Sequence, residues 1–145
     1  MTGSLLKLRA KDAEDVQIIS AVLQDSIVPV CDMLYRPEAK NFVMVAQRLC
    51  RENDATEHPE RICCAANFSN IASVQTHGID LHHHDRMLDL LMMVNEGDSL
   101  TMLFAGDAKI RLDLAADWSM ILEDFGEPWP TACNPCHEGQ AGIKL

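Results

Sequence analysis

The stretch Lys109–Leu114, KIRLDL in one-letter code, alternates strictly between charged and aliphatic side chains. Successive side chains of a β-strand point to opposite faces of its sheet, so this stretch predicts a strand with one buried and one solvated face. That pattern is typical of antiparallel sheets, in which one face packs on the core and the other meets water. An antiparallel sheet is therefore expected in the C-terminal half of the chain.

The residues before this stretch predict further strands of the same sheet. Apolar or alternating runs bounded by polar turn residues are typical of strands and hairpins. Ser69–Asn70 predicts a tight turn, and Arg51–Glu60 and His77–Arg86 predict polar loops. The predicted strands cover residues 33–35, 41–49, 61–68, 71–76, 87–94, 100–104 and 109–114.

The N-terminal segment predicts one strand followed by one helix. Residues 5–9 are suited to a short strand, and Asp12 is suited to the N-cap of a helix. Val16, Ile19 and Leu23 recur at the spacing of one helix face, which predicts a helix over residues 13–25.

A second amphipathic helix is predicted after the last strand. Asp117 is expected at its N-cap and Gly126 just beyond its end. Its apolar face is expected to contain Trp118, Ile121, Leu122 and Phe125, at positions i, i+3, i+4 and i+7.

This order of elements predicts an α+β fold, with an N-terminal strand and helix, about seven antiparallel strands and a closing C-terminal helix. Consecutive antiparallel strands either leave unpaired edges or curl into a barrel. A pleckstrin-homology-like barrel is one expected architecture, and an open antiparallel sheet with the helices on one face is the other. Residues 1–130 are expected to form a single domain. Residues 131–145 lack periodicity and are expected to form a flexible tail.

Three parts of the sequence resemble a small bacterial family known only as a domain of unknown function. They are Leu6–Asp15, the run from Ile19 to Val30, and Phe125–Thr131. The resemblance extends from Leu6 to Thr131. The matching residues are helix caps and packing residues, so the resemblance implies a shared fold and brings no catalytic residue with it.

Charge and hydropathy exclude several classes of partner. The chain has 22 acidic and 12 basic residues and a net charge of −10, which disfavours binding to nucleic acid. No apolar stretch approaches the roughly 18 residues of a membrane span. The N-terminus has no signal-peptide pattern, so a cytoplasmic location is expected.

Six cysteines are present, and two of them lie in the most specific short motif of the chain. Cys31, Cys50 and one of the pair Cys63 and Cys64 are expected in the core, as reduced thiols. Residues 133–137 read CNPCH, the C-x-x-C-H pattern of covalent haem attachment. Without an export signal, that reading is set aside. Cys133, Cys136 and His137 remain weak candidates for a metal or redox site.

A histidine-rich segment over residues 77–85 is the second candidate site. His77, Asp80, His82 and His84 offer imidazole and carboxylate ligands that suit Zn²⁺ or Ni²⁺. The segment is predicted to be a loop, and loops support metal ligands poorly. A solvated loop is therefore the preferred interpretation, and no metal is expected.

The sequence leaves the function open. It contains no nucleophile-elbow motif and no phosphate-binding glycine motif. The leading expectation is a non-enzymatic binding domain without a cofactor, which contacts a protein partner or a second copy of itself as a homodimer. Two alternatives are a metal- or redox-responsive protein, and an enzyme whose site forms only in three dimensions.

Overall fold

The computed structural model of the chain describes residues 5–50 and 59–130. Within these residues the elements are one α-helix, one short 3-10 helix and eight strands. They are β1 (Lys7–Ala10), α1 (Ala13–Leu23), β2 (Ser26–Pro29), η1 (Val30–Asp32), β3 (Met33–Arg36), β4 (Asn41–Leu49), β5 (Glu60–His77), β6 (Met87–Glu96), β7 (Ser99–Phe104) and β8 (Ala108–Pro130).

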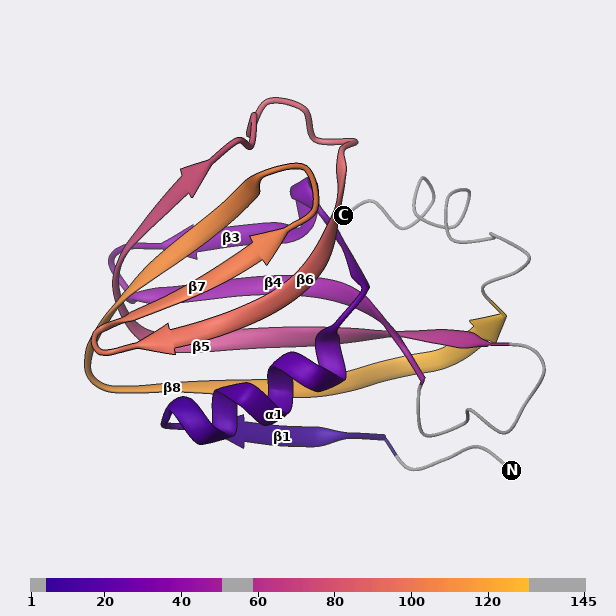
Figure 1. The fold of residues 1–145 in the computed structure, drawn as a ribbon, viewed down its shortest axis with the longest axis horizontal. Coiled ribbons are helices and arrows are strands. Elements are labelled where there is room, and N and C mark those ends of the chain that lie inside the picture. The colour runs from indigo at the N-terminus through magenta and orange to yellow at the C-terminus, as the bar shows by residue number, and fades with distance from the viewer. Residues whose placement is uncertain (1–4, 51–58, 131–145) are drawn as a thin grey trace.

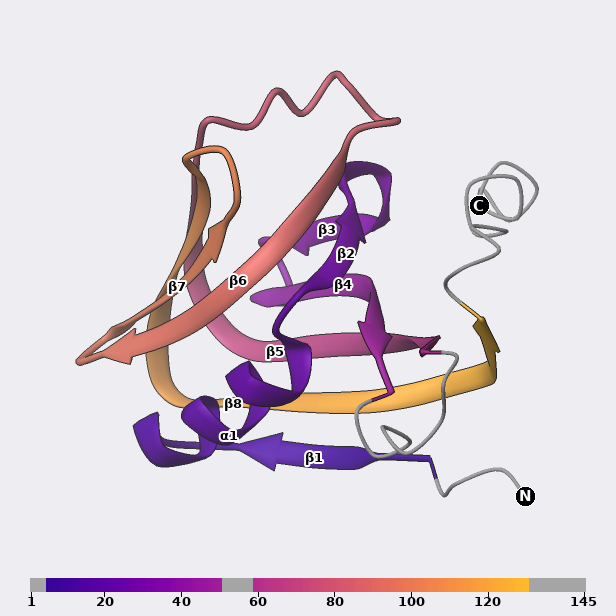
Figure 2. The same ribbon diagram turned by 45° about the vertical axis from the view of Figure 1, so that its right-hand side comes forward.

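Six of the strands close into an antiparallel barrel (Figure 1). The ring runs β8-β5-β4-β2-β6-β7, and β7 pairs back onto β8. Two strands lie outside the ring, because β1 pairs only with β8 and β3 only with β4 among the described strands. Figure 2 shows β6 and β7 on one side of the barrel and β5 with the second half of β8 on the other.

Alternate residues of the barrel strands fill one hydrophobic core. In β4, β5 and β8 the inward positions are matched across the sheet: Met44 lies opposite Ala66, and Ala66 lies opposite Leu122. All three are fully buried. The helix α1 packs against β6 and β1 and adds Val16, Ile19 and Leu23 to the same core.

Several predicted elements are confirmed. The N-terminal strand and helix are present, and the Asp12 carboxylate accepts a hydrogen bond from the Asp15 N–H at 2.9 Å, as an N-cap should. The hairpin of β3 and β4 has the predicted bounds to within one residue. The predicted strands from residue 87 to residue 114 match β6, β7 and the start of β8.

The predicted closing helix is wrong. Residues 117–130 continue β8, which pairs with β5 and β1, so no C-terminal helix exists in the described chain. The closed barrel fits the predicted pleckstrin-homology-like fold, but the C-terminal helix expected to cover the barrel is absent from residues 59–130. The closed ring contradicts the alternative prediction of an open antiparallel sheet. Gly126, expected beyond a helix, has φ 78° at a register shift between β5 and β8.

The predicted tight turn at Ser69–Asn70 is also wrong. The strand β5 runs through it without reversing, and the register with β8 shifts there. Asn70 has φ 63° and Asp117 has φ 60°, a left-handed conformation that asparagine and aspartate tolerate. The Asn70 side-chain amide donates to the Asp117 carbonyl oxygen at 2.8 Å. These two polar residues therefore mark a place where two paired strands bend together, and neither a turn nor a helix cap.

Candidate functional site

The histidine-rich segment is exposed and spread along a loop. His77, at the end of β5, lies 3.8 Å from Asp107 through its Nε2 and the Oδ2 of the carboxylate. The Asp80 carboxylate accepts a hydrogen bond from the His82 N–H at 2.9 Å and lies 3.7 Å from His83 Nε2. His84 is exposed as well. The segment is therefore a solvated loop ordered by an aspartate that bonds to its own backbone.

The electrostatics of this loop follow from the same contacts. The backbone N–H of His82, and then the nearby imidazole of His83, lower the pKa of Asp80 below its ordinary value. Within residues 5–50 and 59–130, no three histidine, cysteine, aspartate or glutamate side chains come together as a metal site. The metal candidates His77, Asp80, His82 and His84 thus stay a prediction.

The described cysteines follow the prediction in part: Cys50 and one of the adjacent pair are buried as expected, but Cys31, also expected in the core, is only half-buried. Cys50 and Cys64 are buried, whereas Cys31 and Cys63 are half-buried. Burial, and then the charge of the neighbouring Asp124, raises the pKa of the Cys64 thiol to about 12. Cys133, Cys136 and His137 lie outside the described residues, so the tail motif stays a prediction.

A groove lies between α1 and β6. It begins where β6 loses one of its two neighbours: β2 pairs with residues 87–90 of β6 and goes no further. At this point the register between β6 and β7 shifts between Leu90 and Met92, which is the mark of a β-bulge. The edge of β6 beyond Leu90 therefore faces α1, with no strand beside it in the described part of the chain.

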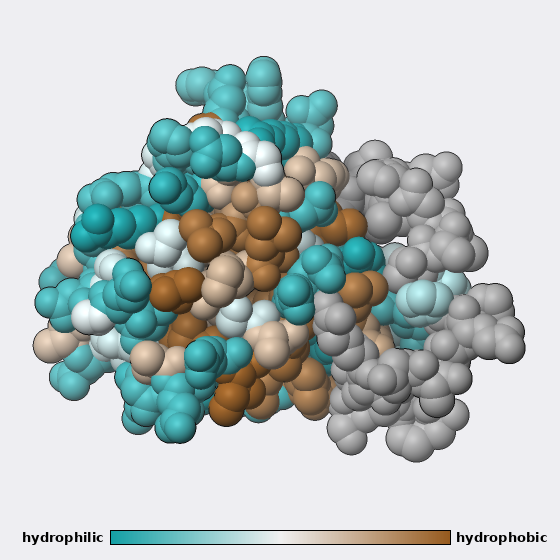
Figure 3. Space-filling view, in the orientation of Figure 1, coloured by the Kyte–Doolittle hydropathy of each residue, from teal (hydrophilic) through white to brown (hydrophobic). Residues whose placement is uncertain are grey.

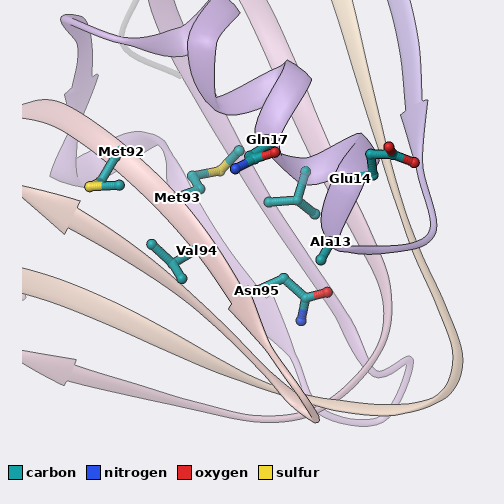
Figure 4. A pocket seen from close by; sticks show the side chains of 8 residues that line it. Ala13, Glu14, Gln17, Met92, Met93, Val94 and Asn95 are labelled. Carbon is teal, nitrogen blue, oxygen red and sulfur yellow. The ribbon is translucent and has the colours of Figure 1, made fainter.

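The α1–β6 groove has a largely apolar lining (Figure 4) and a volume of about 500 Å³. Of the side chains that line it, only Glu14 is ionisable. In Figure 4, Gln17 and Met93 approach each other between the helix and the strand. The lining residues are Ala13, Glu14, Val16, Gln17, Met92, Met93, Val94 and Asn95. A groove with one carboxylate and no nucleophile suits binding better than catalysis.

The backbone of β6 is directed into this groove. The Met93 N–H donates to the Ser20 hydroxyl of α1 at 2.9 Å, so it points away from β7. Backbone groups of an antiparallel strand alternate between its two edges, so those of Asn95 point the same way as those of Met93. Asn95 therefore presents an N–H donor and a C=O acceptor on an edge that no described strand pairs with.

Exposed apolar side chains lie beside the groove. Leu91 and Met92 are 44% and 46% exposed on β6, and Ile18 is 57% exposed on α1. Figure 3 shows hydrophobic residues gathered in the middle of this face, where β6 crosses in Figure 1. Large exposed apolar clusters are typical of interaction sites.

Comparison with known proteins gives the family of the chain. The model of a protein family of unknown function, DUF2948, matches residues 6–137. The chain belongs to the DUF2948 family. This confirms the resemblance drawn from the sequence. No curated protein and no solved structure matches the chain. Among the described residues of this DUF2948 protein, no helix is long and apolar enough to cross a membrane.

Sequence reasoning missed two deeply buried charges in the described part of this DUF2948 chain. Asp124, read from the sequence as part of a solvated helix end, is 4% exposed inside the barrel. Arg48 donates to both of its carboxylate oxygens, from Nε at 2.8 Å and from Nη2 at 2.7 Å. The pair stabilises the packing of β1, because the Leu6 N–H also donates to Asp124 Oδ2 at 2.8 Å.

A sequence signal for the groove did exist. The run Leu90–Met93 contains four apolar residues in a row and breaks the alternation of the strand around it. A break of this kind is what a β-bulge produces. No sequence pattern predicted the contact between α1 and β6, which is seen only in the folded chain.

Proposed function

We propose that this DUF2948 protein is a protein-interaction domain that binds an extended segment of a partner in the α1–β6 groove. The supporting observation is the unpaired edge of β6 beyond the bulge. An extended peptide adds to such an edge through main-chain hydrogen bonds, while pockets beside the edge accept its alternate side chains. Asn95 supplies the donor and acceptor, and the apolar lining supplies the pockets.

The charge of the molecule indicates the composition of the partner segment. Glu14 lines the groove, Glu96 ends the strand beside it, and the chain carries a net charge of −10. Such a surface favours basic residues and speeds the approach of a cationic segment. The expected ligand is therefore a strand-forming peptide with apolar side chains at every second position and lysine or arginine between them.

A selection from a random peptide library displayed on phage tests this proposal. Peptides selected on the full chain are compared for binding to the wild type, Asn95→Pro and Asn95→Ala. Proline removes the edge N–H and is tolerated where that N–H does not face a paired strand. Alanine keeps the N–H and removes only the side-chain bonds to Gly97 and Ser99, which makes it the matched control.

The expected result is that Asn95→Pro raises the Kd of the selected peptides at least about tenfold, the effect of losing one main-chain hydrogen bond. Asn95→Ala should leave the Kd within about twofold of the wild type, since the edge N–H remains. Peptides that bind all three proteins equally, or a library that yields no binder, would refute binding at this edge.

A further inference from the structure

The outward face of the sheet on the far side of the barrel is largely apolar, with Asn67 as a polar residue between Val43 and Ile121. Val43 of β4 lies opposite Leu34 of β3, and Val45 lies opposite Ala65 of β5. None of these four side chains belongs to the buried core of the barrel. The outer sheet face, as we name it, consists of Leu34, Val43, Val45, Cys63, Ala65, Ile121 and Phe125, from strands β3, β4, β5 and β8.

Two of these side chains are conspicuously exposed. Leu34 is 58% exposed and Phe125 is 45% exposed. A sheet with one solvated face normally carries polar residues at its outward positions. Here two outward positions of β4, 43 and 45, carry valines next to buried Phe42 and Met44, between the polar Asn41 and Gln47. Apolar residues on both faces are typical of a sheet that is covered on both sides.

The charges around the outer sheet face differ in sign from those of the molecule. Lys7, Arg9 and Arg36 are exposed at outward positions beside it, and Glu123 is the acid among them. Glu123 lies 3.9 Å from Lys7 and is neutralised by it. Because the chain has a net charge of −10, its other surfaces repel a second copy. This face therefore lacks the excess of acids that makes the other surfaces of two copies repel each other, and its remaining basic residues, Arg9 and Arg36, lie on the flanking strands β1 and β3.

We infer that a second copy of the chain covers the outer sheet face, so that the protein is a homodimer with two sheets packed face to face. A symmetric dimer uses the same patch on both copies, which a flat apolar face satisfies. Sheets pack in this way about 10 Å apart, with their side chains interdigitating. The strands β4, β5 and β8, each about 27 Å long over about eight residues, and the four-residue strand β3 lie about 4.8 Å apart and give a footprint of roughly 450 Å². Because side chains project from the sheet, the accessible surface buried exceeds this flat footprint and comes closer to the roughly 800 Å² per partner of a stable interface.

The dimer would leave the α1–β6 groove accessible. In the ring β8-β5-β4-β2-β6-β7, β6 is three strands from β5 in either direction. The groove and the outer sheet face therefore lie on opposite sides of the barrel, as Figure 2 also shows. The dimer would present two grooves pointing outward, an arrangement suited to a partner with repeated binding segments.

Sedimentation equilibrium of the full chain tests this inference. The wild type should sediment with the mass of two chains, in reversible equilibrium with one. Leu34→Glu together with Phe125→Glu places two charges in the interface and should raise the dimer dissociation constant at least about 100-fold. The matched control is Ile18→Glu together with Met92→Glu, which adds the same charges at similarly exposed apolar residues on the groove side.

The control variant should keep the mass of two chains. A wild type with the mass of one chain, or a control that dissociates while the Leu34 and Phe125 variant does not, would overturn the inference. Circular dichroism checks that each variant is folded. If the double variant is unfolded, the single Leu34→Lys variant replaces it, because Leu34 lies on a strand that pairs only with β4 in the described chain and its side chain is 58% exposed.

Discussion

Asp124 is an ionised side chain inside the barrel, and its partners explain why it is tolerated there. A buried charge is acceptable when it is paired and its oxygens are hydrogen-bonded. Arg48 and the Leu6 N–H donate three short hydrogen bonds to the Asp124 carboxylate. The Asp124 N–H in turn donates to the Leu6 carbonyl oxygen at 3.0 Å. The pair fixes the second half of β8 against β4 across the intervening strand β5.

Replacing Asp124 by asparagine should destabilise the protein strongly. The substitution keeps the size of the side chain but leaves the guanidinium of Arg48 buried without its counter-charge, which costs about 3–5 kcal/mol in the free energy of unfolding. Urea unfolding measures the loss. Glu123→Gln is the matched control, because the neighbouring Glu123 is exposed and its pair with Lys7 contributes at most about 1 kcal/mol. Equal losses in the two variants would contradict this account.

Cys64 should be unreactive in the folded protein. Burial and the charge of Asp124 raise its pKa from 9.0 to about 12, so near pH 9 it holds about 500-fold less thiolate than an ordinary cysteine. Iodoacetamide at pH 9, followed by peptide mass mapping, should modify half-buried Cys31 and leave Cys64 intact until the chain is unfolded in urea. Native Cys64 reacting as fast as Cys31 would disprove it.

The same shift has a consequence for stability. Above pH 9 the unfolded thiol of Cys64 loses its proton while the folded thiol keeps it. The free energy of unfolding should therefore be unaffected by this group below about pH 9 and fall as the pH rises toward 12. Cys64→Ala should remove this part of the alkaline slope in urea titrations, and an unchanged slope would speak against it.

At the scale of elements, the contact between α1 and β6 forms one wall of the groove. The Ser20 hydroxyl accepts the Met93 N–H at 2.9 Å, where a neighbouring strand would otherwise do so. Beyond the end of β2, the helix α1 therefore supplies the hydrogen-bond acceptor that a neighbouring strand would supply to β6. The rest of the edge, at Asn95, is left for a partner.

Ser20→Ala should loosen this contact. The Met93 N–H would lose its acceptor in a half-buried position, which costs about 1–3 kcal/mol before the small gain from the better helix propensity of alanine. Hydrogen exchange should show faster exchange of the Met93 amide. Ile18→Ala, at a 57% exposed position of the same helix that does not line the groove, should leave that amide unchanged; faster exchange there as well would indicate a general loss of the helix.

The elements also show where sequence patterns succeed. The capped helix α1 and the strands β3, β4, β6 and β7 follow from local patterns, because each carries its own period and turn residues. The second half of β8 does not follow from a local pattern. Its apolar residues fit a helical spacing equally well, and pairing with β5 and β1 makes it a strand. Residue Asp124 at an inward position hid the alternation that a strand would show.

At the scale of the whole molecule, the charge of −10 governs self-association. Two copies repel each other over distances comparable to the Debye length, which shrinks from about 30 Å at 0.01 M salt to about 8 Å at 0.15 M. Added salt should therefore lower the dimer dissociation constant, as measured by sedimentation equilibrium. A dimer that weakens as salt is added would point to attraction between unlike charges instead of the apolar contact.

Local sequence patterns were enough to predict the antiparallel character of the chain, the capped N-terminal helix, and the inward positions of Ile110, Leu112 and Leu114. These follow from periodicities of two and about 3.6, which are local properties of the chain. The closure of the barrel, the burial of Arg48 with Asp124, and the groove at the β6 edge became evident only in the folded chain. Each of these depends on which distant strands pair. The energy of strand pairing depends on the side chains of both strands, which lie far apart in the sequence. The sequence of one strand alone therefore does not predict its partner.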